Sequence, residues 1–401
     1  MNASEPADVA IIGAGPAGLC LGLAAARAGL TVRILERQAR ATLAAPPCDG
    51  REIALTHRSV RTLRELGVWQ HIPEDEVAPL QLARILNGRS PASLDIDARD
   101  GGAGALGVLV SNHLIRRAAW QAVAAEPHVS VRDGIAPTAI DLRAGSVALD
   151  LGTAGALSAR LLVAADSRHS QTRRQLGIGA DLHDFGKTML VCRMAHERPL
   201  AQTAWEWFDE HQTLAVLPVR WARPGHCSSI VLTVPPAEIQ ALLQLDVPAF
   251  DTAMTRRLDG RLGALHLEGE RHAYPLVATW SRRFIAPRTA LIGDAAVGMH
   301  PVTAHGFNLG LRGVATLARE LGAAVRGGQD IGSAALLTRY ERQHRRDTWP
   351  LFVATQAIVQ LYTDDRPLAR LGRHVALTAA RRVPPFRRLM LELLTERRGA
   401  A

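Results

Sequence analysis

The chain of 401 residues is 47% hydrophobic and 21% charged, which is typical of a soluble globular protein with room for two or three domains. This balance excludes a disordered or fibrous chain. The formal net charge of +9 comes almost entirely from arginine, because Lys187 is the only lysine. The arginines are spread along the chain, so we interpret the charge as a general surface property, with attraction to phosphates or lipid headgroups as the alternative.

Cysteine usage and the N-terminal segment favour the cytoplasm. The cysteines lie far apart in the sequence with no C-x-x-C pair, so neither a disulfide framework nor a zinc site is expected. The stretch 9–26 carries no charged residue before Arg27, but Glu5 and Asp8 precede it and glycines interrupt it. It therefore matches neither a signal peptide nor a membrane span.

The N-terminal segment has the features of a dinucleotide site. A continuous apolar run at 9–12 predicts a buried parallel strand, and the turn after it reads G-x-G-x-x-G. A helix rich in alanine and leucine is expected over 19–28, and a second buried strand over 31–35 that ends at Glu36. A glycine turn alone would be weak evidence, but strand, turn, helix, strand and acid in this order are strong evidence.

Each residue of this fingerprint has a physical task. Gly13 permits the tight turn, Gly15 lets backbone N–H groups approach a pyrophosphate, and Gly18 brings the helix close to the strand. The helix N-terminus then faces the phosphates, and the Glu36 carboxylate accepts hydrogen bonds from a ribose. A glycine turn without a ligand is the disfavoured alternative.

A second G-x-G-x-x-G match, at Gly102, Gly104 and Gly107, does not predict another site. The segment 94–100 before it alternates polar and apolar residues and ends in charge that would repel a pyrophosphate. We therefore expect a loop there, followed by a helix over 114–125, and one dinucleotide site of this type in the chain.

Two later strands also end in polar residues. Residues 161–165 predict a buried strand that ends at Asp166, and 289–292 predict another that leads into Asp294. Doubly wound sheets bind ligands at the carboxyl ends of their strands, so Asp294 is a site candidate, with a helix N-cap as the alternative. The glycine-bearing loop 300–310 feeds an amphipathic helix, whose start offers a second place for a negatively polarised group.

Together these segments resemble the FAD-dependent aromatic hydroxylases typified by p-hydroxybenzoate hydroxylase. Within that family they are most similar to the ubiquinone-biosynthesis hydroxylases, and among those to a bacterial 5-demethoxyubiquinol subgroup. The resemblance spans almost the whole chain. It rests on the glycine turn with Glu36, on Arg51 and the run Leu66-Gly67-Val68-Trp69, on Asp166, on 203–218, on Tyr274-Pro275-Leu276, and on 291–296 with Pro301, Gly306, Asn308 and Gly310.

The resemblance implies an α/β fold, in which a Rossmann-like three-layer ββα domain for FAD is interleaved with a mixed-sheet substrate domain and followed by a helical C-terminal tail. The expected FAD-binding domain is discontinuous and comprises 1–71, 105–181 and 279–346. The expected substrate domain comprises 72–104 and 182–278, and the C-terminal helical region 347–401.

FAD is the cofactor that the resemblance implies. Glu36 would bind the adenosine ribose, Arg51 the pyrophosphate region and Asp294 the ribityl chain, and the helix start at 306–310 would face the flavin pyrimidine oxygens. The full set of cofactor-binding residues implied in this way is Gly13, Gly15, Gly18, Glu36, Arg37, Arg51, Asp166, Gly293, Asp294, Pro301, Gly306, Phe307 and Asn308.

The implied activity is a monooxygenase reaction in which NAD(P)H binds transiently and O2 is the oxidant. The substrate would be a hydrophobic aromatic or quinol ring, with 5-demethoxyubiquinol-type hydroxylation as the leading hypothesis. The alternatives are a hydroxylase of another small phenol, a flavin-dependent dehydrogenase and a non-catalytic flavoprotein. A nucleic-acid partner is not expected, because only 4% of the residues are aromatic and these are dispersed. No metal site is expected.

Three positions depart from the family pattern. Ser167 replaces the glycine after Asp166, and Ala304 and His305 stand where the ubiquinone hydroxylases carry glycine and glutamine. His305 is the candidate catalytic residue, because a histidine there would orient or deprotonate a quinol hydroxyl. A packed histidine that makes one hydrogen bond in the loop is the alternative.

The C-terminal stretch 367–398 has helical tendency, with arginines around apolar residues and a break at Pro384-Pro385. One interpretation is a helix pair that caps the flavin domain. The other is a basic amphipathic helix on a membrane, which a lipid-soluble quinol would favour. The chain is accordingly expected in the cytoplasm, with peripheral association to the inner face of the cytoplasmic membrane and membership of a ubiquinone-biosynthesis assembly as further hypotheses.

Overall fold

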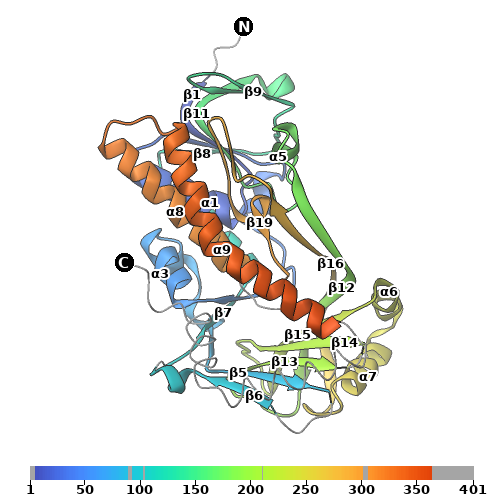
Figure 1. Ribbon diagram of the computed structural model, residues 1–401. Helices are drawn as coiled ribbons and strands as arrows, with labels where there is room; N and C mark the ends of the chain where they lie inside the picture. Colours follow the sequence, from blue (N-terminus) through green and yellow to red (C-terminus); the bar gives the residue numbers. More distant parts are fainter. Residues whose placement is uncertain (1–4, 89–92, 103, 210, 301–305, 364–401) are drawn as a thin grey trace.

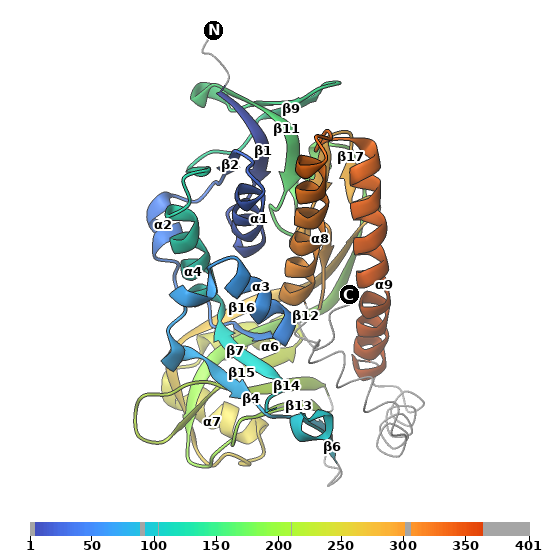
Figure 2. The same cartoon turned by 90° about the vertical axis from the view of Figure 1, so that its left-hand side faces the viewer.

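The computed structural model describes residues 5–88, 93–102, 104–209, 211–300 and 306–363. Two large sheets occupy opposite ends of the molecule, and two long helices run along one side (Figures 1 and 2). The upper sheet is mostly parallel and carries the chain's N-terminal strand, whereas the lower sheet is mixed. This confirms the predicted α/β fold class.

The upper sheet has the strand order β17-β18-β11-β1-β2-β8, and β10 and β9 extend it from the first half of β11. Its strands are β1 (Glu5–Ile12), β2 (Val32–Leu35), β8 (Val129–Arg132), β9 (Ala139–Leu142), β10 (Val147–Asp150), β11 (Ala156–Ala164), β17 (Ile285–Ala286) and β18 (Thr289–Leu291). Strands β18, β11, β1, β2 and β8 run parallel to one another, and β17 at the edge is antiparallel to β18.

Both faces of the upper sheet are covered, which explains its continuous apolar strands. Val9 and Ile11 of β1 belong to a core with the helices, whereas Ala10 and Ile12 pack with β9 and β10 on the other face. The helices on the first face are α1 (Pro16–Arg27), α4 (Asn112–Ala124), α8 (Gly306–Arg326) and α9 (Ala334–Thr363). The result is the expected three-layer arrangement of strands, sheet and helices.

The lower sheet has the order β19-β16-β12-β15-β14-β13-β5-β6. Its strands are β5 (Leu82–Asn87), β6 (Ser93–Asp97), β12 (Ala180–His196), β13 (Thr203–Asp209), β14 (Gln212–Pro218), β15 (His226–Val234), β16 (Leu265–Ser281) and β19 (Val297–Gly298). Helices α6 (Pro236–Gln244) and α7 (Val247–Arg257) cover one face through a core that includes Trp207, Leu232 and Phe250.

A small third sheet lies between the two large ones and pairs β3 (Glu52–Leu55), β7 (Gly107–Ser111) and β4 (Ala78–Leu80). The remaining helices are short: α2 (Arg40–Ala44), α3 (His57–Glu65), α5 (Gln171–Gln175) and the 3-10 turns Trp69–His71, Glu74–Glu76, Ala98–Gly101, Gly152–Ala154 and Gly293–Ala295. Gly107 of the second glycine match begins β7 and is followed by α4, in agreement with a connection rather than a dinucleotide turn.

The strands β12 and β16 connect the two halves of the molecule. Each is 17 residues long, and together they form an antiparallel ribbon that runs from the upper to the lower part in Figure 1. The register of this ribbon shifts between Asp184 and Thr188 and again between Val191 and Arg193, as at β-bulges. The two halves are therefore held together by continuous backbone pairing, with interleaved chain segments as the sequence suggested; the domain boundaries themselves stay a prediction.

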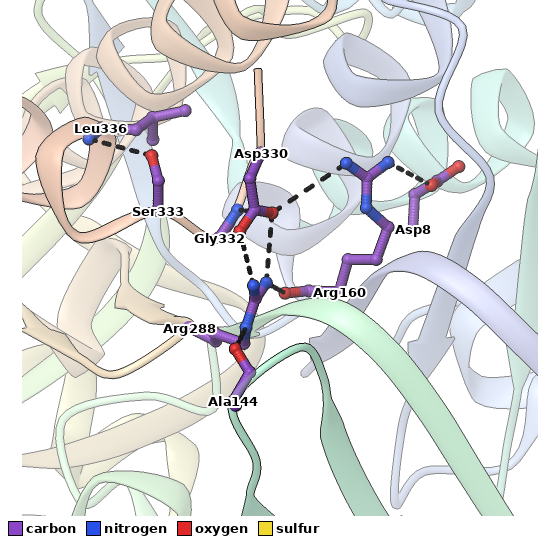
Figure 3. A network of polar contacts seen from close by, with 8 residues as sticks. All are labelled: Asp8, Ala144, Arg160, Arg288, Asp330, Gly332, Ser333 and Leu336. Carbon is purple, nitrogen blue, oxygen red and sulfur yellow. Dashed lines mark hydrogen bonds and ion pairs between the residues drawn. The ribbon is translucent and has the colours of Figure 1, made fainter. Parts of the chain in front are cut away.

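A polar network fixes the far edge of the upper sheet (Figure 3). Arg288, in the turn between β17 and β18, donates to the carbonyl oxygens of Ala144 at 2.7 Å and Arg160 at 2.9 Å, and forms an ion pair with Asp330. Arg160 in turn donates to Asp8 at 3.1 Å. The Arg288 guanidinium holds the pKa of Asp330 below its ordinary value. One side chain thus links β9–β10, β11 and the segment between α8 and α9.

The helix α9 extends the chain toward the lower sheet. It runs from Ala334 through Thr363, so the predicted boundary at 346/347 lies inside one helix. Residues 364–401, which include most of the expected C-terminal helical region, lie outside the described residues. Trp349 of α9 contacts Trp280 of β16 with ring centroids 4.9 Å apart, so the helix packs directly on the ribbon that joins the two halves.

Candidate active site

The turn between β1 and α1 has the geometry that its glycines predict. Gly13 has a φ of 107°, and a Cβ there would lie 2.5 Å from the carbonyl oxygen of Ala165. A Cβ on Gly18 would lie 2.0 Å from the carbonyl oxygen of Gly13, whereas a Cβ on Gly15 would meet nothing within 4 Å. Gly13 and Gly18 are therefore required by close packing, and Gly15 leaves open space beside the backbone.

Glu36 lies directly after β2 and is held by backbone donors. Its Oε2 accepts from the Ala14 N–H at 2.7 Å, and its Oε1 accepts from the Gln38 N–H at 2.9 Å. The carboxylate is thus fixed beside the glycine turn, where it retains acceptor capacity for a further donor. Arg37 follows Glu36 in the chain, and both residues line a cavity together with Gly13 and Gly15 of the turn.

Asp166 lies at the end of β11 and organises the next turn. It accepts from the backbone N–H and the hydroxyl of Thr172 at 3.0 and 2.9 Å, and from the Ser170 hydroxyl. Ser167 beside it has a φ of 74°, a left-handed conformation that favours glycine. The departure from the family's Asp-Gly pair therefore places a strained serine at this position.

Asp294 lies at the end of β18, in the 3-10 turn Gly293–Ala295. Its carboxylate forms an ion pair with Arg168 at 3.1 Å, and Arg168 also donates to the carbonyl oxygen of Val277 at 3.0 Å. Gly293 has a φ of 56°. Asp294 does not cap this turn, the alternative considered for it, because it lies inside the turn and Ile292 holds the cap position.

The start of α8 approaches the same region. Gly306 begins the helix, and a Cβ there would meet nothing within 4 Å. Asn308 is buried and points away toward β3: its Nδ2 donates to the Ala54 carbonyl at 2.8 Å, and its Oδ1 accepts from the Thr56 N–H at 3.1 Å. Asn308 therefore positions the helix start. Pro301 and the candidate catalytic His305 lie outside the described residues.

Arg51 lies at the edge of the small sheet, ahead of β3. It donates to Asp49 at 2.6 Å, and its guanidinium carbon lies 5.4 Å from the centre of the Tyr274 ring. Asp49 also accepts from Asn112 at 2.7 Å. Because the Arg51 side chain is 39% exposed and lines the cavity, it can reach an anionic group there without leaving Tyr274.

A single cavity of about 820 Å³ unites these residues. Most of the predicted cofactor-binding residues line it, namely Gly13, Gly15, Glu36, Arg37, Arg51, Asp166, Gly293, Asp294, Gly306 and Phe307. Gly18 and Asn308 support the turn and the helix from behind, and neither is part of the lining. The cavity therefore begins at the glycine turn of the upper sheet.

The same cavity extends to the lower sheet, whose strands form its floor. Side chains alternate along each strand, so one face of β13, β14 and β15 packs on α6 and α7 while the other faces the cavity. The cavity-facing residues of these strands are Glu206, Phe208, Thr213, Ala215, Leu217, Val231 and Thr233. Met189, Val191 and Lys187 of β12 continue the same face. The floor is mainly apolar, with few polar side chains.

Several residues of this cavity were not singled out in the sequence as site residues. Glu206 is a half-buried carboxyl on the floor, and burial raises its pKa to about 8. His300 is buried against Phe185, with ring centroids 4.7 Å apart, and burial lowers its pKa to about 4. Lys187, the only lysine, also lines the cavity. The alternation of tryptophan with Glu206 and Phe208 places Glu206 on the face opposite the tryptophans, but it does not show which face meets the cavity.

The residues present fit a flavin dinucleotide. The open space at Gly15 and Gly306 leaves two backbone segments accessible from the cavity, and Glu36 and Arg51 supply an acceptor and a cation along the same wall. No group of three or more possible metal ligands occurs in the part of the chain that the structure describes. Within that part, no helix has the length and apolar character needed to cross a membrane.

The fold and the cavity together define a class of protein. A parallel sheet with a dinucleotide turn shares one cavity with a mixed sheet that offers an apolar floor, as expected of an oxidoreductase that brings a bound dinucleotide cofactor to an apolar substrate.

Comparison with known proteins agrees with this class. Residues 6–354 match the FAD binding domain family. The chain is 43% identical over 392 residues to ubiquinone hydroxylase UbiM of Neisseria meningitidis, covering 97% of this chain and 84% of the relative. It is 34% identical to ubiquinone hydroxylase UbiL of Rhodospirillum rubrum, covering 97% and 90%, and 27% identical to 3-demethoxyubiquinol 3-hydroxylase of Escherichia coli K12, covering 97% and 98%.

A solved structure shows the same fold. The p-nitrophenol 4-monooxygenase of Pseudomonas putida superimposes with a TM-score of 0.78 at 20% identity, covering 98% of this chain and 100% of that chain. The chain belongs to the FAD binding domain family, and within it to the FAD-dependent aromatic monooxygenases. FAD is its cofactor, which confirms the family and the cofactor expected from the sequence.

Proposed function

We propose that this protein hydroxylates the ring of a quinol intermediate of ubiquinone biosynthesis, of the 5-demethoxyubiquinol type, with NAD(P)H and O2 as co-substrates. The observation that carries the proposal is the continuous cavity of about 820 Å³ between the glycine turn and an apolar floor. A hydrophobic ring with few oxygen substituents suits such a floor. The names of the relatives from N. meningitidis and E. coli support the same substrate class.

The proposed cofactor contacts follow the wall of the cavity. Gly13 and Gly15 would present backbone N–H groups to the pyrophosphate, Glu36 would bind the adenosine ribose, and Arg51 would neutralise phosphate charge. Asp294 and the start of α8 at Gly306 would lie along the ribityl and ring portions. When bound, FAD supplies the transfer of electrons from NAD(P)H and the activation of O2.

The chain's own residues would bind and orient the ring and exclude water. Phe208, Ala215 and Val231 of the floor present apolar surface to the substrate, and Thr213 and Thr233 offer hydroxyl groups at its edge. Exclusion of water by these residues matters because activated oxygen that is exposed to water would be lost as peroxide instead of reaching the ring. Positioning by the floor therefore controls how much product is formed for each NAD(P)H consumed.

The proposal is tested with the purified holoprotein. A yellow protein with a flavin spectrum is expected. Oxygen consumption with NAD(P)H should rise when a short-chain demethoxy quinol is added, and mass spectrometry should show a product heavier by one oxygen atom. The chain should also restore demethoxyquinone conversion in a bacterial strain that lacks this step. Oxygen consumption that yields only peroxide with every quinol would contradict the proposal.

His305 belongs to this proposal as the residue that would orient or deprotonate the substrate hydroxyl. Its exchange for the glutamine of related hydroxylases tests that role. The variant His305→Gln should form less hydroxylated product for each NAD(P)H oxidised. Unchanged rate and unchanged coupling would leave His305 without a catalytic role.

Peripheral association with the inner face of the cytoplasmic membrane, within a ubiquinone-biosynthesis assembly, is the remaining part of the proposal. Trp349 and Val353 of α9 are 51% and 44% exposed, a surface suited to an interfacial contact. Three forms are compared: the original protein, a form without the residues after Asp365, and the same truncated form with Trp349→Ala. Co-sedimentation with vesicles that contain anionic lipid should fall on truncation and fall further when Trp349→Ala is added. Equal sedimentation of all three forms would contradict membrane association.

A further inference from the structure

One carboxyl group stands apart on the floor of the cavity. Among the described residues of β13, β14 and β15 that line the cavity, Glu206 is the sole acid. Trp205 and Trp207 on either side of it face α6 and α7, and Phe208 shares its face. The alternation of the strand therefore directs the Glu206 carboxyl toward the space where the ring of a substrate would lie.

Among the described residues, the neighbours of Glu206 on the adjacent strands offer its carboxyl no partner. Ala215 lies opposite it on β14 and Ile85 opposite it on β5, and neither carries a polar side chain. Leu217, the next cavity-facing residue of β14, is also apolar. Within the described residues no hydrogen bond or ion pair reaches the Glu206 carboxyl. Burial alone raises its pKa to about 8.

Charged residues that line the same cavity either pair with other residues or lie on strands distant from Glu206. Arg51 pairs with Asp49, and Glu52 pairs with Arg193 at 2.8 Å. Lys187 lies on β12, which β14 and β15 separate from β13, so three strand spacings of about 4.8 Å each lie between the two backbones. No charge of the described chain therefore offsets the desolvation of Glu206.

An unpaired carboxyl in an apolar wall is costly unless a ligand completes its hydrogen bonds. An apolar side chain at this position would pack equally well beside Ala215 and Ile85. The group that completes Glu206 must be a small polar substituent on an otherwise apolar ligand. A ring hydroxyl meets this description, because it can both donate to and accept from a carboxyl.

We propose that Glu206 binds a ring hydroxyl of the substrate and accepts its proton during oxygen transfer. This inference rests on the proposed function and adds a catalytic residue to it. The residue lies on the floor that the lower sheet forms, whereas the proposed cofactor contacts at the glycine turn and Glu36 belong to the upper sheet. The ring carbon that receives the oxygen atom is conjugated with this hydroxyl. It would then face the residues proposed to bind the cofactor.

The proton and electron changes balance around this residue. As the ring carbon forms its new bond to one oxygen atom of the activated O2, the O–O bond breaks and its electron pair leaves with the second oxygen atom. At the same time the O–H bond of the ring hydroxyl breaks, its electron pair forms a C=O bond and its proton moves to the Glu206 carboxylate. Loss of the proton on the oxygenated carbon then restores the aromatic ring, and Glu206 returns its proton to the carbonyl oxygen. NAD(P)H supplies the two electrons that reduce the second atom of O2 to water.

The same geometry selects the substrate class. A ring that carries its own carboxylate would place a negative charge beside Glu206 in an apolar wall, and this charge would oppose the ionisation of Glu206 that lets it accept a proton. Uncharged phenols and quinols avoid this repulsion. The protein should therefore discriminate against hydroxybenzoate anions and accept uncharged hydroxylated rings.

The test compares Glu206→Gln with Glu270→Gln in the FAD-loaded protein. Glutamine keeps the shape of the side chain but cannot accept the proton, and Glu270 is an exposed carboxyl of the same sheet that is not part of the lining. With a soluble methoxy-methyl hydroquinone as the probe, Glu206→Gln should lower hydroxylated product by at least about 100-fold. NAD(P)H oxidation should continue and yield peroxide, the flavin content should stay unchanged, and Glu270→Gln should match the original protein.

The pH profile and the aspartate variant give a second readout. Product formed per NAD(P)H by the original protein should rise with pH as Glu206 ionises, and this rise should be absent in Glu206→Gln. Glu206→Asp keeps the carboxylate and should keep the pH dependence at a lower rate. Equal coupling and equal pH profiles for Glu206→Gln and the original protein would overturn the inference.

The outcomes separate this inference from the proposed function. If the original protein converts the hydroquinone and Glu206→Gln does so equally well, the role of Glu206 is overturned while quinol hydroxylation stands. If the original protein converts no quinol, the proposed function is overturned. In that case the role of Glu206 is tested by the binding of unsubstituted phenol, followed through the flavin absorbance. The affinity for phenol should be about tenfold lower in Glu206→Ala than in the original protein. Equal affinity of the two proteins would overturn the role of Glu206.

Discussion

The Glu206 carboxyl also makes the stability of the protein depend on pH, independently of any substrate. Burial raises its pKa from the ordinary 4.5 to about 8 in the folded chain. Above about pH 4.5 the unfolded chain releases this proton while the folded chain retains it, so the folded state loses stability as the pH rises. The loss grows up to about pH 8 and is constant beyond it, because both states are then ionised.

The magnitude follows from the size of that pKa difference. Each pKa unit corresponds to about 1.4 kcal/mol, so complete ionisation would cost about 5 kcal/mol. Because Glu206 is only half-buried, screening by solvent reduces this cost. Between about pH 5.5 and pH 8.5 we therefore expect the original protein to lose about 2 kcal/mol of unfolding free energy that Glu206→Gln keeps.

Thermal unfolding of the two proteins at both pH values measures this difference. At about pH 8.5 the melting temperature of Glu206→Gln should exceed that of the original protein, and the gap should be about 4 °C larger than at pH 5.5. Comparison across pH removes the baseline effect of the substitution. Glu270→Gln is the control, because its side chain is exposed to solvent. A gap that stays constant with pH, or narrows toward pH 8.5, would refute the reasoning.

Four further substitutions test the glycine turn, the turn after β11 and the polar network around Arg288. Ser167→Gly should raise the unfolding free energy by about 1 kcal/mol, because glycine accepts a φ of 74° without strain; a lower melting temperature would contradict the conformation. Gly15→Ala should melt normally without FAD but bind FAD at least about tenfold more weakly by titration, and unchanged affinity would exclude close approach of the pyrophosphate. Gly18→Ala should instead fail to fold stably, because its Cβ would lie 2.0 Å from a carbonyl oxygen. Arg288→Ala should lose about 1–3 kcal/mol in urea unfolding, because two carbonyl oxygens and Asp330 lose their donor; a loss no larger than that of the exposed Arg283→Ala would contradict this.

The dinucleotide end could be predicted because its signals are local in the sequence. The turn of Gly13, Gly15 and Gly18 sits between a strand and a helix that short-range patterns define, and Glu36 follows the next strand directly. The end of β18 at Asp294 follows the same rule. Such residues converge because parallel strands present their carboxyl ends at one edge, so no knowledge of distant pairing was needed.

Ser167 occupies a position where the family resemblance predicts glycine but does not explain why glycine is needed. The family pattern predicted glycine after Asp166, and the sequence alone gave no reason for it. The φ of 74° supplies the reason, since the turn that Asp166 holds through Thr172 requires a left-handed residue there. A backbone requirement of this kind becomes visible only when β11 and α5 are placed together.

The floor of the cavity was harder to predict, because both faces of the lower sheet are covered. The alternation in β13 separates Trp205 and Trp207 from Glu206 and Phe208, but it does not say which face meets α6 and α7 and which meets the cavity. A reader of the sequence would assign Glu206 to solvent, since an isolated acid between tryptophans is usually on the exposed face. In the structure the cavity face carries Glu206, and the neighbouring positions on β14 and β5 are the apolar Ala215 and Ile85. The burial that the sequence does not reveal raises the pKa of Glu206, which gives the carboxyl a proton affinity suited to a ring hydroxyl at neutral pH.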